Sequence, residues 1–307
     1  MKIDKSEPKV VVLMLTYNGK KLLEESIPSY LENKYGNFEL VIIDNGSSDG
    51  TFDFVRENFP GVHTIRLEKN RGYSGGFNFG IEFTMKNTGA DYILISNDDI
   101  WADSNLISEL VKVAENDENI GFVTGKVYFY NNGIKTNILQ TVGKKSDDFS
   151  ILGKHIGSYE EDLGQYDLVT TRSFCDDVFT LVRKEVVVQT KGYDENFFLQ
   201  FEETDWQLRA KKLGYKIYYT PHAKLWHKVG MSTGGPESSE RHFNFERNEI
   251  LLIKKHGNSN HFLKYLFYRL FYRLPIRTLR YTLLGKFDLI LANLRGTASG
   301  IIWAIRN

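Results

Sequence analysis

Two adjacent carboxylates, Asp98 and Asp99, follow a short apolar run at 92–95 that is long enough for one buried strand. Such a pair is costly, because like charges close in space raise each other's pKa. A divalent cation removes that penalty, and oxygen ligands suit Mg²⁺ or Mn²⁺ bound to a diphosphate. A solvated turn that caps the helix expected near Ser104 explains the pair equally well, so the prediction of a metal site depends on the surrounding segments.

Polar segments follow four of the expected strands, at the point where each strand ends. In a mostly parallel sheet these ends meet at one edge, and ligands bind beyond that edge. Four polar strand ends are hard to explain as turns alone, so they predict a binding site. The segments are Thr16-Tyr17-Asn18, Asp44-Asn45, Asn70-Arg71-Gly72 and Asn97-Asp98-Asp99.

Two of these segments suit a nucleotide. Asp44 stands at a strand end, where it could accept a hydrogen bond from a pyrimidine N3–H, although the turn after it also suits a helix cap. Arg71 and Gly75 belong to a glycine-rich run at 70–80, where the backbone can approach a ligand and a helix N-terminus favours an anion. Tight helix packing explains these glycines as well, and their spacing is not that of the dinucleotide-binding fingerprint.

A second cluster of acids, Glu202, Glu203 and Asp205, opens a helix after an aromatic run at 197–201. Acids in a first helical turn are stabilised by the helix dipole, which explains the cluster without any catalytic role. A carboxylate there could also act as a general base on an acceptor hydroxyl. His227 follows a strand; it is either a structural histidine or a further ligand of the metal.

These side chains need a scaffold, and the pattern of elements predicts an α/β fold. Apolar runs of strand length alternate with helical periodicity, which indicates a mostly parallel sheet flanked by helices. Segment 131–167 is polar and weakly periodic, and 228–240 reads as a loop. The expected strands are 10–16, 38–44, 63–67, 92–96, 121–130 and 215–220, and the expected helices are 20–33, 51–58, 76–87, 105–115 and 202–213.

The charge of the 307-residue chain is balanced overall but unevenly distributed. The 39 basic and 39 acidic residues cancel, which argues against a nucleic-acid partner. From His261 onward, however, eight basic residues accompany the single acid Asp288, so an acidic body carries a basic tail. We therefore expect a domain at 1–258 and a basic, aromatic-rich helical tail at 259–307.

Cys175 is the only cysteine, so no internal disulfide can form, and we expect a buried thiol and a cytoplasmic location. The first residues do not resemble a signal peptide, and no apolar run is long enough to cross a bilayer.

In the tail, apolar residues and arginines both recur at helical spacing, although Pro275 should break or kink the helix. This pattern suits attachment to the anionic inner face of the plasma membrane. Packing on the main domain or a homo-oligomer contact explains it nearly as well. The arginines in question are Arg269, Arg273, Arg277 and Arg280.

Taken together, these segments resemble the family 2 glycosyltransferases, which have the GT-A fold. The resemblance covers roughly residues 8–230 and, within the family, is greatest to bacterial rhamnosyltransferases of surface-polysaccharide assembly. The matching segments are 15–19, 41–51, 70–80, 97–99, 197–209 and 221–227.

The resemblance implies a role for each candidate residue. Asp99 would be the principal metal ligand, joined by His227, and Glu203 stands where the family usually has its aspartate base. Asp98 stands where many members have proline. The residues expected to bind the donor are Thr16, Tyr17, Asn18, Asp44, Arg71, Gly75, Asn97 and Asp98.

The expected reaction is a metal-dependent, inverting transfer of a sugar from a dTDP- or UDP-linked donor to a hydroxyl of a glycan or lipid-linked glycan. Rhamnose is the sugar that the resemblance suggests. Two alternatives stay open: a nucleotidyltransferase that makes sugar nucleotides, and a non-catalytic subunit that binds a nucleotide sugar.

Overall fold

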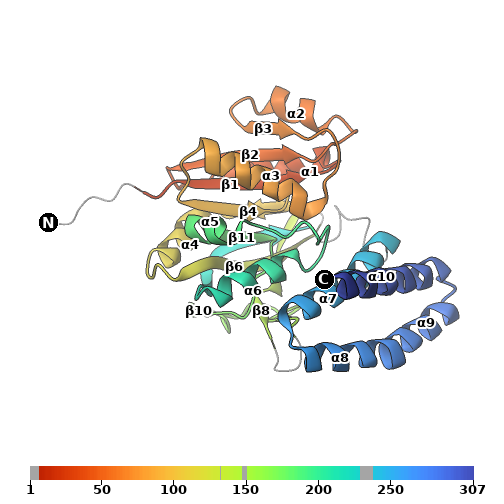
Figure 1. Cartoon of the computed structure of the whole chain (residues 1–307). Coiled ribbons are helices and arrows are strands. Elements are labelled where there is room, and N and C mark those ends of the chain that lie inside the picture. Colours follow the sequence, from red (N-terminus) through yellow and green to blue (C-terminus); the bar gives the residue numbers. More distant parts are fainter. Residues whose placement is uncertain (1–6, 132, 147–150, 229–237) are drawn as a thin grey trace.

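A ten-stranded mixed sheet forms the centre of the molecule in the computed structural model, which describes residues 7–131, 133–146, 151–228 and 238–307. The main path runs in the order β10-β12-β6-β11-β4-β1-β2-β3, while β5 pairs with β12 and β7 with β6 (Figure 1). These strands are β1 (Val10–Thr16), β2 (Phe38–Asp44), β3 (His63–Arg66), β4 (Tyr92–Ser96), β5 (Ile100–Ala102), β6 (Ile120–Asn131), β7 (Ile134–Thr141), β10 (Thr170–Thr171), β11 (Phe179–Arg183) and β12 (Lys216–His227).

The half of the sheet that carries the polar strand ends is parallel. β1 pairs in parallel with both β2 and β4, and β2 with β3. β1 and β4 are apolar almost throughout, because both faces of these central strands are covered. The register places Thr16 beside Asp44 and Met14 beside Ser96, so the polar segments after these strands emerge at one edge.

Helices cover both faces of the sheet, and alternate residues of β1 belong to different cores. Val12 packs with residues of α1 (Lys20–Leu31), α2 (Thr51–Asn58) and α4 (Leu106–Ala114). Leu13 lies in the opposite core with residues of α3 (Gly72–Asn87), α5 (Lys184–Thr190) and α6 (Glu202–Lys212). The predicted α/β fold with a mostly parallel sheet between helices is confirmed.

Apart from shifts of one or two residues, three segments differ from the sequence-based expectation. α3 begins at Gly72 and not at 76, with a φ of +73° at its first residue. β12 continues to His227, seven residues beyond the expected end, because its second half pairs with β5 and β6. The polar segment 131–167 contains β7 and a small hairpin of β8 (Lys144–Lys145) and β9 (Lys154–His155). Most of the predicted loop 228–240 lies outside the described residues.

The C-terminal helices pack against one another beside the sheet (Figure 1). α10 lies along α7 at close range, since a Cβ on Gly296 would come 2.5 Å from the carbonyl oxygen of Phe243. Pro275 falls in the first turn of α9, directly after a π-helical segment, and the backbone stays right-handed helical across the junction, so the helix changes type there without breaking. The elements are α7 (Ser239–His256), α8 (Ser259–Tyr268), η1 (Arg269–Arg273), α9 (Leu274–Leu283) and α10 (Phe287–Arg306).

Four arginines of the tail were expected beside a membrane surface, but three of them point into this helical unit. Arg269 is fully buried and donates to Glu246 and, at 2.8 Å, to Glu249 of α7. Arg273 donates to Glu249 at 2.6 Å, and Arg277 donates to Glu246. Buried arginines require such partners, because an unpaired buried charge is strongly destabilising. Within the described residues, no helix is both long and apolar enough to cross a membrane.

Candidate active site

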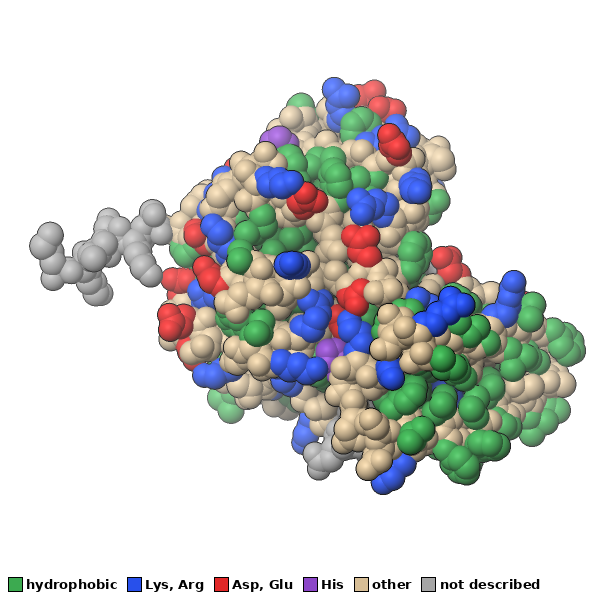
Figure 2. Space-filling model, viewed as in Figure 1, with side chains coloured by type: hydrophobic (Ala, Val, Ile, Leu, Met, Phe, Trp, Pro, Cys, Tyr) green, Lys and Arg blue, Asp and Glu red, His purple; other side chains and the backbone are tan. Residues whose placement is uncertain are grey.

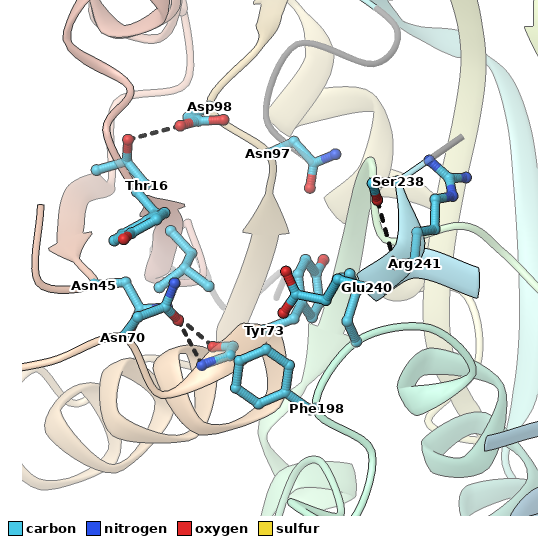
Figure 3. Close-up of a pocket in the computed structure, with 14 residues that line it drawn as sticks. Thr16, Asn45, Asn70, Tyr73, Asn97, Asp98, Phe198, Ser238, Glu240 and Arg241 are labelled. Carbon is cyan, nitrogen blue, oxygen red and sulfur yellow. Dashed lines mark hydrogen bonds between the residues drawn. The ribbon is translucent and has the colours of Figure 1, made fainter. Parts of the chain in front are cut away.

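The polar strand ends meet at a pocket of about 320 Å³. Figure 3 shows Thr16 and Asp98 on one side and Ser238 and Arg241 on the other. The structure therefore brings together segments from β1, β2, β3 and β4 with the start of α7. The lining residues are Leu15, Thr16, Tyr17, Asn45, Asn70, Gly72, Tyr73, Asn97, Asp98, Phe198, Leu199, Ser238, Glu240 and Arg241.

Asp98 is buried and tied to the end of β1. Its Oδ2 accepts a 2.6 Å hydrogen bond from the Thr16 hydroxyl. Burial, together with the charge of neighbouring Asp99, raises the pKa of Asp98 to about 7. A Cβ on Gly19 would come 2.2 Å from Thr16 Oγ1 and 2.5 Å from Asp98 Oδ2, so only glycine fits against this pair.

Asp44 lies just behind the pocket wall. Its Oδ1 accepts from the backbone N–H of Ser47 at 2.9 Å. Its Oδ2 is buried without a hydrogen-bond partner, 3.6 Å from Arg66 Nε. A buried carboxylate oxygen without a partner is rare in proteins and marks a place for a ligand's donor group. Asn18, in the left-handed region at a φ of 53°, links this turn to the β1–α1 loop through Ser47 and Ser48.

The glycine-rich segment supports the pocket through its backbone. The side chain of Asn45 accepts from the N–H of Arg71 at 2.9 Å and donates to the carbonyl of Gly72 at 3.0 Å. The Arg71 guanidinium lies 3.4 Å from Glu195, and neither Arg71 nor Gly75 lines the pocket. The structure thus places these two candidate residues beside the pocket and not in its wall.

Asp99 and His227 meet directly beside Asp98, although neither of them lines either pocket. His227 Nε2 lies 2.9 Å from Asp99 Oδ1, and this buried oxygen has no hydrogen-bond partner. His227 Nδ1 lies 2.8 Å from Gln140 Oε1, so the ring is held between this amide and Asp99. A carboxylate oxygen this close to a ring nitrogen requires a proton or a cation between them.

These two side chains fit a divalent cation that is shared with a substrate. Neighbouring ligands of an octahedral Mg²⁺ at about 2.0–2.1 Å are separated by about 3 Å, which matches Asp99 and His227. Among the described residues, no group of three or more His, Cys, Asp or Glu side chains could hold a metal. Mg²⁺ usually takes only one or two protein ligands and completes its shell with phosphate oxygens and water.

A second pocket, of about 560 Å³, contains the acid cluster. Lys144, on the small hairpin, reaches into it and binds Asp176 at 2.5 Å and Glu203 at 3.1 Å. Burial alone would lower the pKa of Lys144, but the charges of these two carboxylates raise it above its usual range, so the ammonium persists. The Glu203 carboxylate therefore faces a permanent positive charge.

Glu202 and Asp177 line the same pocket but have no cation within ion-pair distance among the described residues. Burial, reinforced by the charge of Glu203, raises the pKa of both carboxyl groups well above the usual range. Asp177 accepts a hydrogen bond from the Tyr193 hydroxyl at 2.5 Å, whereas Oε2 of Glu202 has no partner. Their protonated forms are therefore favoured relative to those of ordinary carboxyl groups, whereas Glu203 has an ion-pair partner.

Asp205 lies outside both pockets, in a cluster of basic side chains. Its carboxylate lies 2.6 Å from Lys255 Nζ, 2.8 Å from His256 Nε2 and 2.8 Å from Arg209 Nε. Burial alone would raise the pKa of Asp205, but the hydrogen bond from His256 and the charges of Arg209 and Lys255 lower it. Asp205 thus joins α6 to α7, and the structure does not bring it together with Glu202 and Glu203.

Asp205→Asn is expected to lower the free energy of unfolding by roughly 3 kcal/mol at neutral pH, because Arg209 and Lys255 lose a buried counter-ion and His256 loses its hydrogen-bond partner. Since the pKa of Asp205 is depressed in the folded state, this stabilisation is complete above the ordinary value of 3.8 and decreases as the pH falls below it. Urea unfolding at pH 7 and pH 3 measures the difference between wild type and variant.

The matched control is Glu82→Gln, which removes the partner of Lys86 at an exposed site and should change the stability little. An Asp205→Asn protein as stable as wild type at pH 7 would contradict the structural role of this carboxylate.

The two pockets are continuous, since both are lined by Tyr73, Asn97, Leu199 and Arg241. Arg241 is the only positively charged side chain among the described residues of the first pocket, and it forms no ion pair within the described part of the chain. Its guanidinium is free to bind an anion where the pockets join. The start of α7 lines the first pocket through Ser238, Glu240 and Arg241. The backbone N–H of Arg241 donates to the Ser238 side chain, which caps this helix.

Several residues of this site were not among the sequence-based candidates. Lys144 lies in the weakly periodic segment and carries no motif, so no local signal indicated it. Asp176 and Asp177 form a second pair of adjacent acids beside Cys175, which is buried as expected, and that adjacency was a usable signal. Arg241 joins the site only through the packing of α7.

Comparison with known proteins agrees with this geometry. The family model for glycosyl transferase family 2 matches residues 11–189. The chain therefore belongs to this family, and its α/β domain is a glycosyltransferase domain.

A poly-beta-1,6-N-acetyl-D-glucosamine synthase of Staphylococcus aureus (strain COL) is 28% identical over 229 residues, which are 74% of this chain and 51% of the synthase. The chain thus spans about half the length of the curated relatives it matches. Among solved structures, GalNAc-T7 with UDP, GalNAc and Mn²⁺ superposes with a TM-score of 0.63 at 16% identity, covering 82% of this chain and 48% of that protein.

The mannosyltransferase PcManGT from Pyrobaculum calidifontis, in complex with GDP-Man and Mn²⁺, gives a TM-score of 0.55 at 14% identity. That match covers 97% of this chain and 76% of the mannosyltransferase. At these identities, the two structural matches support the fold alone.

Proposed function

We propose that this protein transfers a sugar from a nucleoside diphosphate to an acceptor hydroxyl, with inversion at the anomeric carbon. The observation that carries the proposal is the joined pair of pockets. One is lined by Thr16, Asn97 and Asp98 at the polar strand ends, and the other holds Glu203 beside Lys144. Arg241, which forms no ion pair among the described residues, lies where the two pockets meet.

In this arrangement the first pocket holds the donor. Thr16, Tyr17 and Asn45 line its nucleoside end, with the free Oδ2 of Asp44 behind them as an acceptor for a base N–H. Asp99 and His227 would hold Mg²⁺ or Mn²⁺, which supplies Lewis-acid stabilisation of the leaving diphosphate. Arg241 adds a second positive charge at the same end.

The second pocket holds the acceptor. Glu203 takes the proton from the acceptor hydroxyl as its oxygen attacks the anomeric carbon from the face opposite the diphosphate. The new C–O bond forms while the bond to the diphosphate breaks, and the electron pair leaves with the diphosphate. Lys144 holds the Glu203 carboxylate in place, whereas burial and the charge of Glu203 raise the pKa of Glu202 and Asp177, which disfavours either of them as the base.

The choice of a particular sugar rests on similarity to other proteins. The sequence motifs resemble those of rhamnosyltransferases, whereas the relative named above makes an N-acetylglucosamine polymer. We retain rhamnose from a dTDP-linked donor as the first candidate and N-acetylglucosamine from UDP as the second. The acceptor in this proposal is a glycan or a lipid-linked glycan.

The donor half of the proposal is tested by calorimetric titration with UDP, dTDP and GDP in the presence of Mn²⁺. One diphosphate should bind, and Asp44→Ala should weaken it by roughly 10-fold to 100-fold, the range for a hydrogen bond to a charged group. Asp53→Ala, at an exposed position on α2, is the matched control and should bind like wild type.

Unchanged affinity in Asp44→Ala would remove this residue from the nucleoside site. The two rival functions are separated by the products formed from the matching nucleotide sugar. A transferase releases the nucleoside diphosphate, a nucleotidyltransferase consumes a nucleoside triphosphate and releases pyrophosphate, and a binding subunit gives no turnover.

A further inference from the structure

The outer side of the C-terminal helices exposes an unusual amount of apolar surface. Among the described residues, 14 of the 24 large hydrophobic side chains that are exposed lie after residue 258. Figure 2 shows hydrophobic side chains gathered over this part of the molecule. The outer apolar face consists of Leu263, Phe267, Tyr268, Phe271, Tyr272, Ile276, Leu279, Leu283, Leu284, Phe287, Leu291, Leu294, Ile302 and Ile305.

α9 gives the clearest sign that this face has an external partner. The helix has no buried residue, yet Ile276, Leu279 and Leu283 recur at helical spacing and are 50%, 62% and 78% exposed. An amphipathic helix normally buries its apolar stripe against its own domain. An exposed apolar area of this extent marks a protein or membrane contact.

The charges beside this face are positive. Lys264, Arg280, Arg295 and Arg306 are exposed and form no ion pair among the described residues. On the helix surface Arg280 is a neighbour of Ile276, Leu283 and Leu284, at the spacing of three or four residues. The only acid after residue 258 is Asp288, which accepts a 2.9 Å hydrogen bond from Ser239.

The internal arginines sharpen this assignment. Arg269, Arg273 and Arg277 form ion pairs with Glu246 and Glu249, and these pairs hold α8, η1 and α9 against α7. They are therefore unable to reach a partner. The surface that remains combines leucines and aromatics with a few lysines and arginines, as in helices that lie in a membrane interface.

We propose that the outer apolar face is a docking surface for an anionic lipid bilayer, with the apolar side chains entering the interface and the four basic residues contacting headgroup phosphates. A second copy of this chain, bound through the same face, would place its basic residues opposite those of the first copy, which is unfavourable. α7 connects this face to the proposed active site, since it packs on α10 and contributes Arg241 to both pockets.

The test is flotation of the full chain with vesicles of phosphatidylcholine alone or mixed with phosphatidylglycerol, at low and high salt. The wild type should float with the anionic vesicles, and less so at high salt. The double variant Leu279→Glu/Leu283→Glu should reduce the bound fraction by at least about 10-fold, because each leucine loses its transfer into the interface. Since α9 buries no residue, this variant should fold normally, which circular dichroism checks.

The matched control is Leu163→Glu/Leu168→Glu, at two leucines that are 80% and 78% exposed outside the C-terminal helices; it should bind vesicles like wild type. Arg280→Glu should weaken binding by at least about fivefold on anionic vesicles, since one basic residue near such a surface contributes about this factor. Nucleotide binding by the α9 variant should stay unchanged, so a failure of lipid docking is separable from a failure of the proposed function.

Two results would overturn the proposal. One is a wild-type chain that stays unbound with anionic vesicles at low salt. The other is a wild-type dimer in size-exclusion chromatography that Leu279→Glu/Leu283→Glu converts to a monomer, which would assign the face to a contact between copies.

Discussion

Asp99→Ala is expected to reduce sugar transfer by at least about 10³-fold, since stabilisation of a leaving group by a bound cation contributes several kcal/mol. The reason is the position of Asp99 Oδ1, which is buried, lacks a hydrogen-bond partner and lies 2.9 Å from His227 Nε2. The measurement is the transfer rate at saturating donor, together with calorimetric binding of the nucleoside diphosphate with and without Mn²⁺.

The binding measurement distinguishes a metal ligand from a merely structural residue. In wild type, Mn²⁺ should strengthen nucleotide binding, and in Asp99→Ala this effect should disappear. His227→Ala should show the same loss in weaker form, because the carboxylate still attracts the cation. A folded Asp99→Ala protein with near-normal transfer and unchanged metal dependence would refute the assignment.

Glu203→Gln is expected to cut transfer by roughly 100-fold or more while leaving donor binding intact, the usual scale for loss of a general base. Glu203 lies in the second pocket, where Lys144 pairs with it at 3.1 Å and with Asp176 at 2.5 Å. Single-turnover transfer and nucleotide titration on the same preparation separate the chemical step from binding.

Glu202→Gln supplies the matched comparison at the neighbouring position. Burial and the charge of Glu203 raise the pKa of Glu202 and favour its protonated form, so a neutral amide of the same shape should preserve activity within a few-fold. If Glu202→Gln is inactive and Glu203→Gln is active, the two roles are reversed. Normal turnover in both variants would exclude the whole cluster from catalysis.

The parallel half of the fold could be predicted from the sequence with considerable accuracy. The expected strands 10–16, 38–44 and 92–96 coincide with β1, β2 and β4, because uninterrupted apolar runs of this length are stable only inside a covered sheet. The gathering of Thr16, Asn97 and Asp98 at one pocket followed from the same pattern, since parallel strands place their carboxyl ends together.

The choice among the acids at 202–205 depended on tertiary structure. All three stand in one helical turn, and their spacing alone distinguishes them poorly. Glu203 faces Lys144, which is 59 residues away in the sequence, while Asp205 turns to Lys255 and His256 on α7. Charge pairing across such separations is set by how helices and hairpins pack, so composition and periodicity carry no signal for it.

The C-terminal helices show the same division. Helical periodicity and an excess of basic residues after residue 258 were evident in the sequence, whereas the break or kink expected at Pro275 is only a change of helix type. Only the packing of α8 to α10 on α7 decided that Arg269 is buried against Glu246 and Glu249, whereas Arg280 stays exposed. A local pattern predicts that one side of a helix is basic or apolar. The neighbours that packing provides then determine which of those side chains are paired inside the fold and which stay exposed.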